Sequence, residues 1–92
     1  MSVIVGVYVD SIIKWPTTIR CFKDGSCHMI ADTLEELHAM ARKIGLKRAW
    51  FQDTKTPHYD LTVSKRAMAV KLGAMQLSLR DFVEKKRSIH DR

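Results

Sequence analysis

Long hydrophobic runs are absent from this sequence, and cysteine is scarce. The longest apolar stretch, residues 3–9, contains Gly6 and is far shorter than the roughly 20 residues of a membrane-spanning helix. The first residues also lack the basic segment and cleavage site of a secretory signal, which favours a cytoplasmic location. Cys21 and Cys27 are too few for a disulfide framework, and we expect them to be reduced thiols.

Several well-known functional motifs are also missing. There is no glycine-rich phosphate loop, no nucleophile elbow and no Cys-x-x-Cys pair. Acidic residues are in the minority, since 16 Lys and Arg face 10 Asp and Glu, for a net charge of +6. This excess favours an anionic partner, namely a nucleotide, a nucleic acid or an acidic protein surface, although solubility alone would also explain it.

The chain has the composition of a folded domain. Hydrophobic residues make up 46% and charged residues 28%, which is typical of globular proteins and not of disorder. A length of 92 residues fits one domain, residues 1–92, with a thin core. Five short segments have the composition of strands: residues 3–9, 18–22, 28–30, 49–52 and 75–79.

Turn and cap residues separate these segments. Asp24-Gly25 is a strong hairpin signal between the second and third strands. A first helix is predicted to start at Asp32 or Thr33, with a glutamate three residues further on, and to end at Gly45. Thr62 and Ser78 are the predicted caps of two more helices. The inward faces of the first two helices are predicted to include Leu34, Leu37, Ala41 and Ile44, and Val63, Ala67 and Val70.

The order of elements, β-ββ-α-β-α-β-α, predicts an α/β domain. We expect a mainly parallel or mixed sheet with an N-terminal hairpin and three helices. In such sheets, ligands bind at the carboxyl ends of parallel strands, where residues 10, 52–53 and 78–80 would lie on one rim. An exposed hairpin edge and a thin core would also suit a homodimer.

Imidazole and carboxylate groups occur in two short motifs, His28-Met-Ile-Ala-Asp32 and His58-Tyr-Asp60. Such groups bind divalent metals and transfer protons near neutral pH. The candidate ligands of a divalent metal are Asp10, His28, Asp32, His58 and Asp60. If the protein is an enzyme, Asp10, His58 and Asp60 are its candidate catalytic residues. The simpler alternative is that Asp32 only caps a helix and that the histidines only form hydrogen bonds.

Two basic residues, Lys65 and Arg66, lie in the first turn of the second predicted helix, where cations oppose the helix dipole. With the free N–H groups of that turn they would form a phosphate clamp, and the alternative is a solvated surface. Arg80 repeats the pattern at the third helix. The complete set of candidate ligand-binding residues is His28, Asp32, His58, Tyr59, Lys65, Arg66 and Arg80.

Two tryptophans and one further histidine have predicted structural or binding roles. Trp50 in the fourth strand is expected to lie in the core, and His38 borders the buried face of the first helix, where a hydrogen-bonded structural role is favoured. Trp15 lies in a loop and would be able to stack on a base.

These motifs together resemble those of a known family. The segments concerned are Tyr8-Val-Asp10, His28-Met-Ile-Ala-Asp32, Glu36-Leu-His38-Ala, Ile44-Gly-Leu, Trp50-Phe-Gln52, His58-Tyr-Asp60 with Lys65-Arg66, and Leu72-Gly-Ala74. Their order along nearly the whole chain is similar to that of the "domain of unknown function 4031" family, small stand-alone proteins of bacteria and phages. None of these segments falls in residues 12–27, so the resemblance leaves the role of Trp15 open. The resemblance implies a bacterial or phage cytoplasmic setting and no established activity.

The sequence is compatible with three functions. The first is binding of a phosphate-bearing ligand, a nucleotide or nucleic acid, at the rim. The second is metal-dependent hydrolysis of a phosphoester, as in a phosphodiesterase or nuclease. The third is interaction with a protein, such as inhibition of a host protein by a phage factor, in which the polar groups only brace loops.

Overall fold

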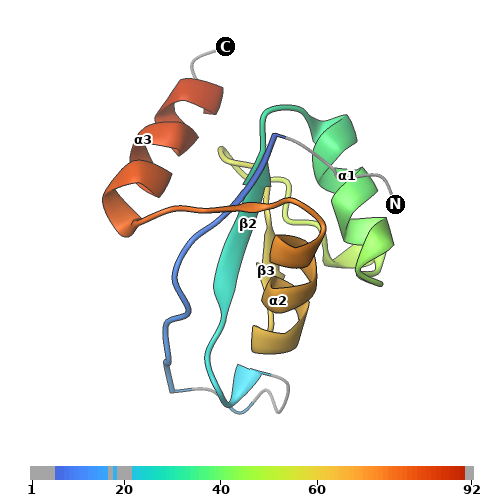
Figure 1. Ribbon diagram of the computed structural model, residues 1–92, viewed down its shortest axis with the longest axis vertical. Helices are drawn as coiled ribbons and strands as arrows, with labels where there is room; N and C mark the ends of the chain where they lie inside the picture. The colour runs from blue at the N-terminus through green and yellow to red at the C-terminus, as the bar shows by residue number, and fades with distance from the viewer. Residues whose placement is uncertain (1–5, 17, 19–21, 91–92) are drawn as a thin grey trace.

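The computed structural model describes residues 6–16, 18 and 22–90, apart from the side chain of residue 90 (Figure 1). Among these residues, four strands form one mixed sheet in the order β3-β2-β1-β4, accompanied by three α-helices and one short 3₁₀ helix, η2. The strands are β1 (Val7–Val9), β2 (Cys27–Ala31), β3 (Tyr59–Leu61) and β4 (Met75–Gln76). The helices are α1 (Leu34–Lys43), η2 (Arg48–Trp50), α2 (Val63–Lys71) and α3 (Leu79–His90). The α/β class, the mixed sheet and the three helices are as predicted.

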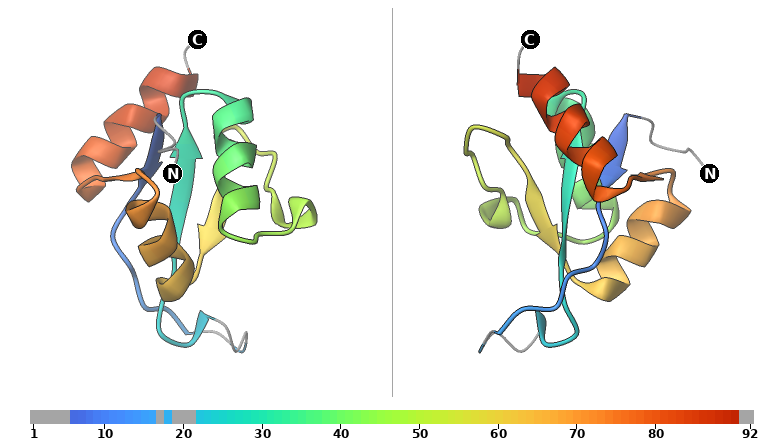
Figure 2. Two further views of the ribbon diagram at one scale, coloured as in Figure 1. Left: turned by 45° about the vertical axis from the view of Figure 1, so that its right-hand side comes forward. Right: turned by 90° about the vertical axis from the view of Figure 1, so that its left-hand side faces the viewer.

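The alternation of side chains along the strands divides the sheet into two different faces. Val9, Met29 and Leu61 are fully buried in the core that α1 and α2 cover. The residues that alternate with them along each strand point to the opposite face. Tyr8 and Ile30, which the register pairs, are two of these residues. This second face is covered by α3, so that α1 and α3 lie on opposite sides of β2 (Figure 2).

The N-terminal hairpin was predicted between residues 18–22 and 28–30, but β2, which contains residues 28–30, pairs on this side with β1. These strands pair antiparallel, and an isolated bridge between Ile13 and Ser26 extends the pairing. The predicted strand at residues 18–22 falls largely on residues 19–21, outside the described residues, as does Cys21. Phe22 lies in the turn that Asp24-Gly25 predicted, since its carbonyl accepts the Gly25 N–H over 2.9 Å. Gly25 has φ +103°, and a Cβ there would lie 3.0 Å from the Ile13 carbonyl oxygen.

The helix boundaries follow their predicted caps. The Thr33 side chain accepts the Glu36 N–H at the start of α1, and the Glu36 carboxylate accepts the Thr33 hydroxyl over 2.9 Å. Gly45 has φ +81° just after α1, where the Leu46 N–H donates to the Ala41 carbonyl over 2.8 Å. Thr62 caps α2 in the same way as Thr33 caps α1.

The predicted strand at residues 49–52 is wrong. Residues Arg48–Trp50 form η2, and only Gln52 pairs, in an isolated antiparallel bridge with His58. The strand in this part of the chain is β3, whose Tyr59 and Leu61 face the core. Trp50, predicted to be buried, is 52% exposed, because a 3₁₀ turn directs it away from the sheet.

Some helix faces also differ from prediction. Leu34 is 50% exposed, and Met40 contributes to the α1 face of the core instead. In α2 the buried residue is Ala69, while Val63 and Ala67, which were predicted to face inward, are exposed. The apolar positions of α2 are spread around the helix, so their spacing did not identify the buried side. No helix of the described residues has the length and apolar character that crossing a membrane requires.

Candidate functional site

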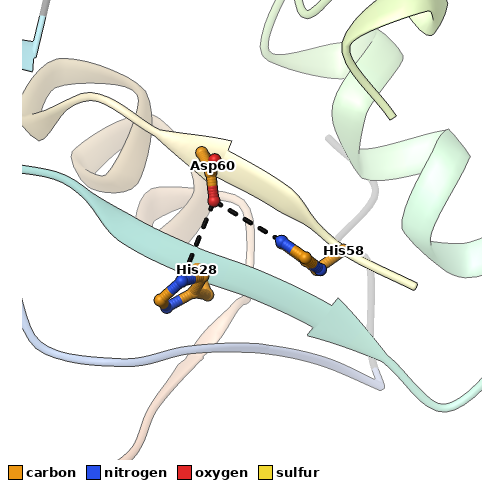
Figure 3. A group of neighbouring side chains, drawn as sticks. All are labelled: His28, His58 and Asp60. Atoms are coloured by element: carbon orange, nitrogen blue, oxygen red, sulfur yellow. Dashed lines mark ion pairs between the residues drawn. The ribbon is translucent and has the colours of Figure 1, made fainter. Parts of the chain in front are cut away.

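His28, His58 and Asp60 meet on the face of the sheet that α3 covers (Figure 3). The register of β2 and β3 pairs His28 directly with Asp60, and His58 lies two residues before Asp60 on the same side. The Asp60 Oδ1 atom is 3.9 Å from His28 Nε2 and 3.6 Å from His58 Nε2. We call these three residues the His–His–Asp cluster.

The other nitrogen of each imidazole is already engaged. His58 Nδ1 lies 2.8 Å from the Thr56 carbonyl oxygen, which only accepts hydrogen bonds, so His58 Nδ1 carries a proton. His28 Nδ1 lies 2.9 Å from Asp10 Oδ2 and donates to that carboxylate. In the neutral forms, each Nε2 atom therefore presents a lone pair toward Asp60.

Asp10 fixes the orientation of His28 through two hydrogen bonds that its carboxylate accepts. It is only 4% exposed, and its Oδ1 atom also accepts the His28 main-chain N–H over 2.7 Å. The hydrogen bond to Asp10 raises the pKa of His28, against the opposing effect of burial. Asp10 itself is held by Arg66, whose Nε donates to the Asp10 carbonyl over 2.9 Å. A histidine whose second nitrogen donates to a carboxylate is the usual arrangement of a metal ligand.

The spacing of the cluster suits a cation. The three ligand atoms all lie within 4.8 Å of one another. Two ligands that are each about 2.0–2.2 Å from a tetrahedral ion are about 3.3–3.6 Å apart, so the three atoms would have to move closer together to reach zinc-like distances. Two imidazoles and one carboxylate are ligands that Zn²⁺ and other divalent transition metals accept, and three protein ligands leave a coordination position open.

A pocket of about 360 Å³ lies against this cluster. His28 and Ile30 of β2 form one wall. Phe82 of α3 also lines the pocket, and its ring centroid lies 6.4 Å from that of His28. Lys86 of α3 and Lys55 from the loop before β3 also line it. The pocket is therefore bordered by the two imidazoles and by the two lysine side chains.

The buried residues beneath the cluster contribute no second reactive group. Cys27, next to His28, faces the core, and burial, with the nearby Asp10 carboxylate, raises the pKa of its thiol to about 12. A thiol of this kind is not ionised at neutral pH and is unreactive.

Of the predicted site residues, the structure brings together Asp10, His28, His58 and Asp60, and Arg66 supports them through Asp10. Asp32 lies apart, just beyond β2, where it accepts the Tyr8 hydroxyl over 3.0 Å.

The remaining predicted residues are directed elsewhere. Tyr59 points to the core face, where its hydroxyl is 2.8 Å from His38 Nδ1. Lys65 Nζ donates to the Ile44 carbonyl at the end of α1. Arg80 is exposed and pairs with Glu84 on its own helix. The phosphate clamp predicted at the start of α2 is thus not assembled, since Lys65 and Arg66 point to different partners.

Sequence reasoning missed several neighbours of the cluster. Thr56, which fixes the His58 tautomer, was not predicted, whereas residue 52 was predicted on the rim, and Gln52 donates to the Asp60 Oδ2 atom. Lys55 and Lys86 were not predicted as pocket residues. The polar loop preceding the His58 motif was the one signal for Thr56 and Lys55, while Lys86 is placed by the packing of α3, which no local pattern reveals.

The fold and the cluster define a small α/β domain with a candidate three-ligand metal centre on the α3 face of its sheet. The chain belongs to the family described as "Protein of unknown function (DUF4031)", whose sequence model matches residues 7–89. This confirms the family resemblance seen in the motifs. No curated protein and no solved structure matches the chain.

Proposed function

We propose that this protein binds a divalent metal ion through His28, His58 and Asp60 and hydrolyses a phosphoester held in the adjoining pocket. The observation that carries the proposal is the direction of the two Nε2 lone pairs, both facing one carboxylate oxygen. Three electron-rich atoms so placed repel one another unless a cation, either a proton or a metal ion, lies between them. The engaged Nδ1 atoms prevent the imidazoles from relieving this by changing tautomer.

The pocket supplies the reason for choosing a phosphate. Lys55 and Lys86 border it beside the histidines, and the chain as a whole carries +6. An anionic group entering the pocket would meet positive charge from the lysines and from the ion together. The phosphate-bearing ligand expected from the sequence is retained in this proposal, with the cluster and these lysines in place of Lys65 and Arg80.

The roles of the chain's own residues follow from their contacts. His58 and Asp60 would bind the ion directly, and Asp10 would act through His28 by fixing its orientation and proton. A divalent ion in such a site polarises a phosphoryl oxygen and lowers the pKa of a bound water toward neutrality. Phe82 and Ile30 make one side of the pocket apolar, which would limit the access of competing water.

The test begins with the metal alone. Calorimetric titration of the metal-free protein with Zn²⁺ and Mn²⁺ is expected to show one equivalent bound, and Asp60→Asn is expected to abolish binding. Asp24→Asn, an exposed residue of the hairpin turn, is the matched control. Hydrolysis of bis(p-nitrophenyl) phosphate should require the metal and should be lost in Asp60→Asn.

The outcomes separate the three functions. Metal binding with retention of a phosphate ligand but no turnover on any phosphoester would reduce the proposal to a binding domain. A folded protein that binds no metal would overturn it. Large losses of stability in His58→Ala and Asp60→Ala, without any effect of metal, would favour bracing residues in a protein-interaction factor.

A further inference from the structure

A second hollow, of about 470 Å³, lies beside the His–His–Asp cluster at the β3 edge of the sheet. Its apolar wall consists of Phe22 from the hairpin turn, Leu46 and Trp50. Gln52 and Asp60 supply polar groups. We call it the edge pocket, and its volume is within the range of small-molecule sites.

Asp60 connects the edge pocket with the cluster. Its Oδ1 atom faces the two histidines, and its Oδ2 atom accepts a hydrogen bond from the Gln52 amide nitrogen. The carboxylate of Asp60 lines the edge pocket, whereas the imidazoles line the pocket on the other side. Asp60 therefore borders both the edge pocket and the proposed metal site.

The polar groups of the edge pocket are mostly committed. Lys65 Nζ donates to the Ile44 carbonyl, and the Thr62 hydroxyl accepts the Lys65 N–H as the cap of α2. Because the Gln52 amide nitrogen donates to Asp60, its side-chain oxygen is directed away from that carboxylate, and no donor among the described residues contacts it. The edge pocket thus offers aromatic and aliphatic surface together with one hydrogen-bond acceptor.

Trp50 is a large aromatic side chain that lies outside the core. It is 52% exposed, and η2 holds it out of the core. Lys47 lies over its ring, with Nζ 5.5 Å from the centroid, which places a cation beside the aromatic wall. A planar heterocycle stacked on Trp50 would gain apolar contact and lie close to positive charge.

We infer that the edge pocket binds the base of a nucleoside phosphate, so that the substrate class of the proposed enzyme is a nucleotide or the end of a nucleic-acid strand. This inference rests on the proposed metal-dependent function for the position of the phosphate. The base stacks on Trp50 between Phe22 and Leu46, and an exocyclic amino group donates to the Gln52 side-chain oxygen. Adenine and cytosine carry such a donor on their pairing edge.

Trp50 fluorescence provides a direct test in a Trp15→Phe background, where Trp50 is the only tryptophan of the chain. Adenosine, AMP, ribose 5-phosphate and a short single-stranded oligonucleotide are titrated with Mn²⁺ and again with EDTA. Adenosine is expected to quench Trp50 in both conditions, since stacking needs no metal. AMP is expected to bind more tightly with Mn²⁺ than with EDTA, and ribose 5-phosphate is expected to bind only with Mn²⁺ and without quenching.

A variant pair isolates the base. Because Trp50→Leu removes the fluorescent probe, its binding is measured by calorimetry. The variant should weaken AMP binding about 10-fold or more, as expected for the loss of one stacked base, and leave ribose 5-phosphate binding unchanged. Leu79→Ala, an exposed apolar residue outside both pockets, is the matched control and should change neither. Tighter binding of the oligonucleotide than of AMP would identify a strand end as the source of the base, and the reverse would identify a free nucleotide.

Failure of the inference differs from failure of the proposed function. Equal binding of AMP and ribose 5-phosphate, with no effect of Trp50→Leu, would overturn the base pocket while leaving the metal site intact. Quenching by adenosine without any metal dependence of AMP binding would support the base pocket and overturn the metal site. Concentration-dependent dimerisation that is lost in Trp50→Leu, with no quenching by adenosine, would show that a second copy of the chain covers this pocket, and would also overturn the inference.

Discussion

The Asp10 carboxylate accepts two hydrogen bonds from His28, one from the main-chain N–H to Oδ1 over 2.7 Å and one from Nδ1 to Oδ2 over 2.9 Å. Asp10 directly follows β1, and His28 lies in β2, so the pairing of the two strands brings them together. One carboxylate therefore fixes both the place of the imidazole and the nitrogen that bears its proton. This relationship makes the cluster testable through a residue that does not itself touch the proposed ion.

The first prediction concerns Asp10→Asn. The asparagine oxygen would keep the bond to the His28 main chain, and its amide nitrogen would then face Nδ1 as a donor. His28 would have to move its proton to Nε2 and lose the lone pair that faces Asp60. Loss of such a supporting carboxylate typically costs about 10–100-fold in metal affinity, which calorimetric titration with Zn²⁺ would measure.

The ¹⁵N spectrum of the His28 ring reports the tautomer directly. Asp24→Asn is the control and should leave both affinity and tautomer unchanged. An Asp10→Asn protein with wild-type affinity would show that Asp10 has no positioning role.

The second prediction concerns pH, and two histidines should respond in opposite directions. The hydrogen bond to Asp10 raises the pKa of His28, whereas burial lowers the pKa of His38, with Arg48 and Arg42 adding to the effect. In the metal-free protein, NMR titration should place the midpoint of His28 above, and that of His38 below, the ordinary value of about 6.5.

Stability should follow these shifts. The contribution of His28 is present below about pH 6.5 and is lost as pH rises through its folded pKa, because its protonated form is the one favoured by folding. The penalty from His38 appears as pH falls below about 6.5, because the folded chain resists its protonation. The stability advantage of wild type over His28→Gln should therefore shrink as pH rises above about 6.5, and that over His38→Gln should grow as pH rises toward about 6.5. The same sign for both variants would contradict the two assignments.

The third prediction concerns Lys65→Met. Lys65 Nζ donates to the Ile44 carbonyl, one of the carbonyls left without a helical partner at the end of α1. Removing this bond at a partly exposed site should lower the free energy of unfolding by about 1–2 kcal/mol, measured in urea. Binding of ribose 5-phosphate with Mn²⁺ should be nearly unchanged, because Lys65 lines the edge pocket and not the pocket beside Lys86. Lys71→Met, an exposed residue of the same helix, is the control for loss of charge.

The reverse pattern would restore the original interpretation of this residue. If Lys65→Met kept its stability and lost ribose 5-phosphate binding, the phosphate would lie at the start of α2, and the pocket beside Lys86 would not be its site.

The fourth prediction concerns Tyr59→Phe. The Tyr59 hydroxyl lies 2.8 Å from His38 Nδ1 on the core face, opposite to the cluster. Its removal leaves a buried nitrogen without its partner and should cost about 1–3 kcal/mol of stability. Zn²⁺ affinity, measured on the same sample, should stay at the wild-type value, and a large fall in that affinity would show that Tyr59 acts in the site.

The sequence predicted best what neighbouring residues determine. Thr33 and Thr62 were identified as caps because a cap is satisfied by an N–H group three residues away, within the same short segment. The strand near residues 49–52 was predicted wrongly, since the aromatic residues there suit a strand but strand formation depends on a partner elsewhere in the chain. Here the partner strand β2 pairs with β3 instead.

The site was predictable to the extent that its residue types were unusual. His28, His58 and Asp60 were named from their chemistry, but their convergence depends on the register of β2 with β3. Tyr59 was included with them because the segment had not been recognised as a strand, in which the middle residue must face the opposite side. The partner of Lys65 is a carbonyl at the end of another helix, and no local pattern predicts that contact.

A cation shared by His28 and His58 would also fasten together two stretches of chain that are far apart in sequence. The three ligands are close together only while β2 and β3 are paired, so the ion would bind the native chain and not the unfolded one. Loading with metal would then raise the melting temperature, and a chelator would lower it, in proportion to how tightly the ion is held. For a domain with so small a core, the ion would act as a removable cross-link, and the stability of the folded state would depend on the metal concentration.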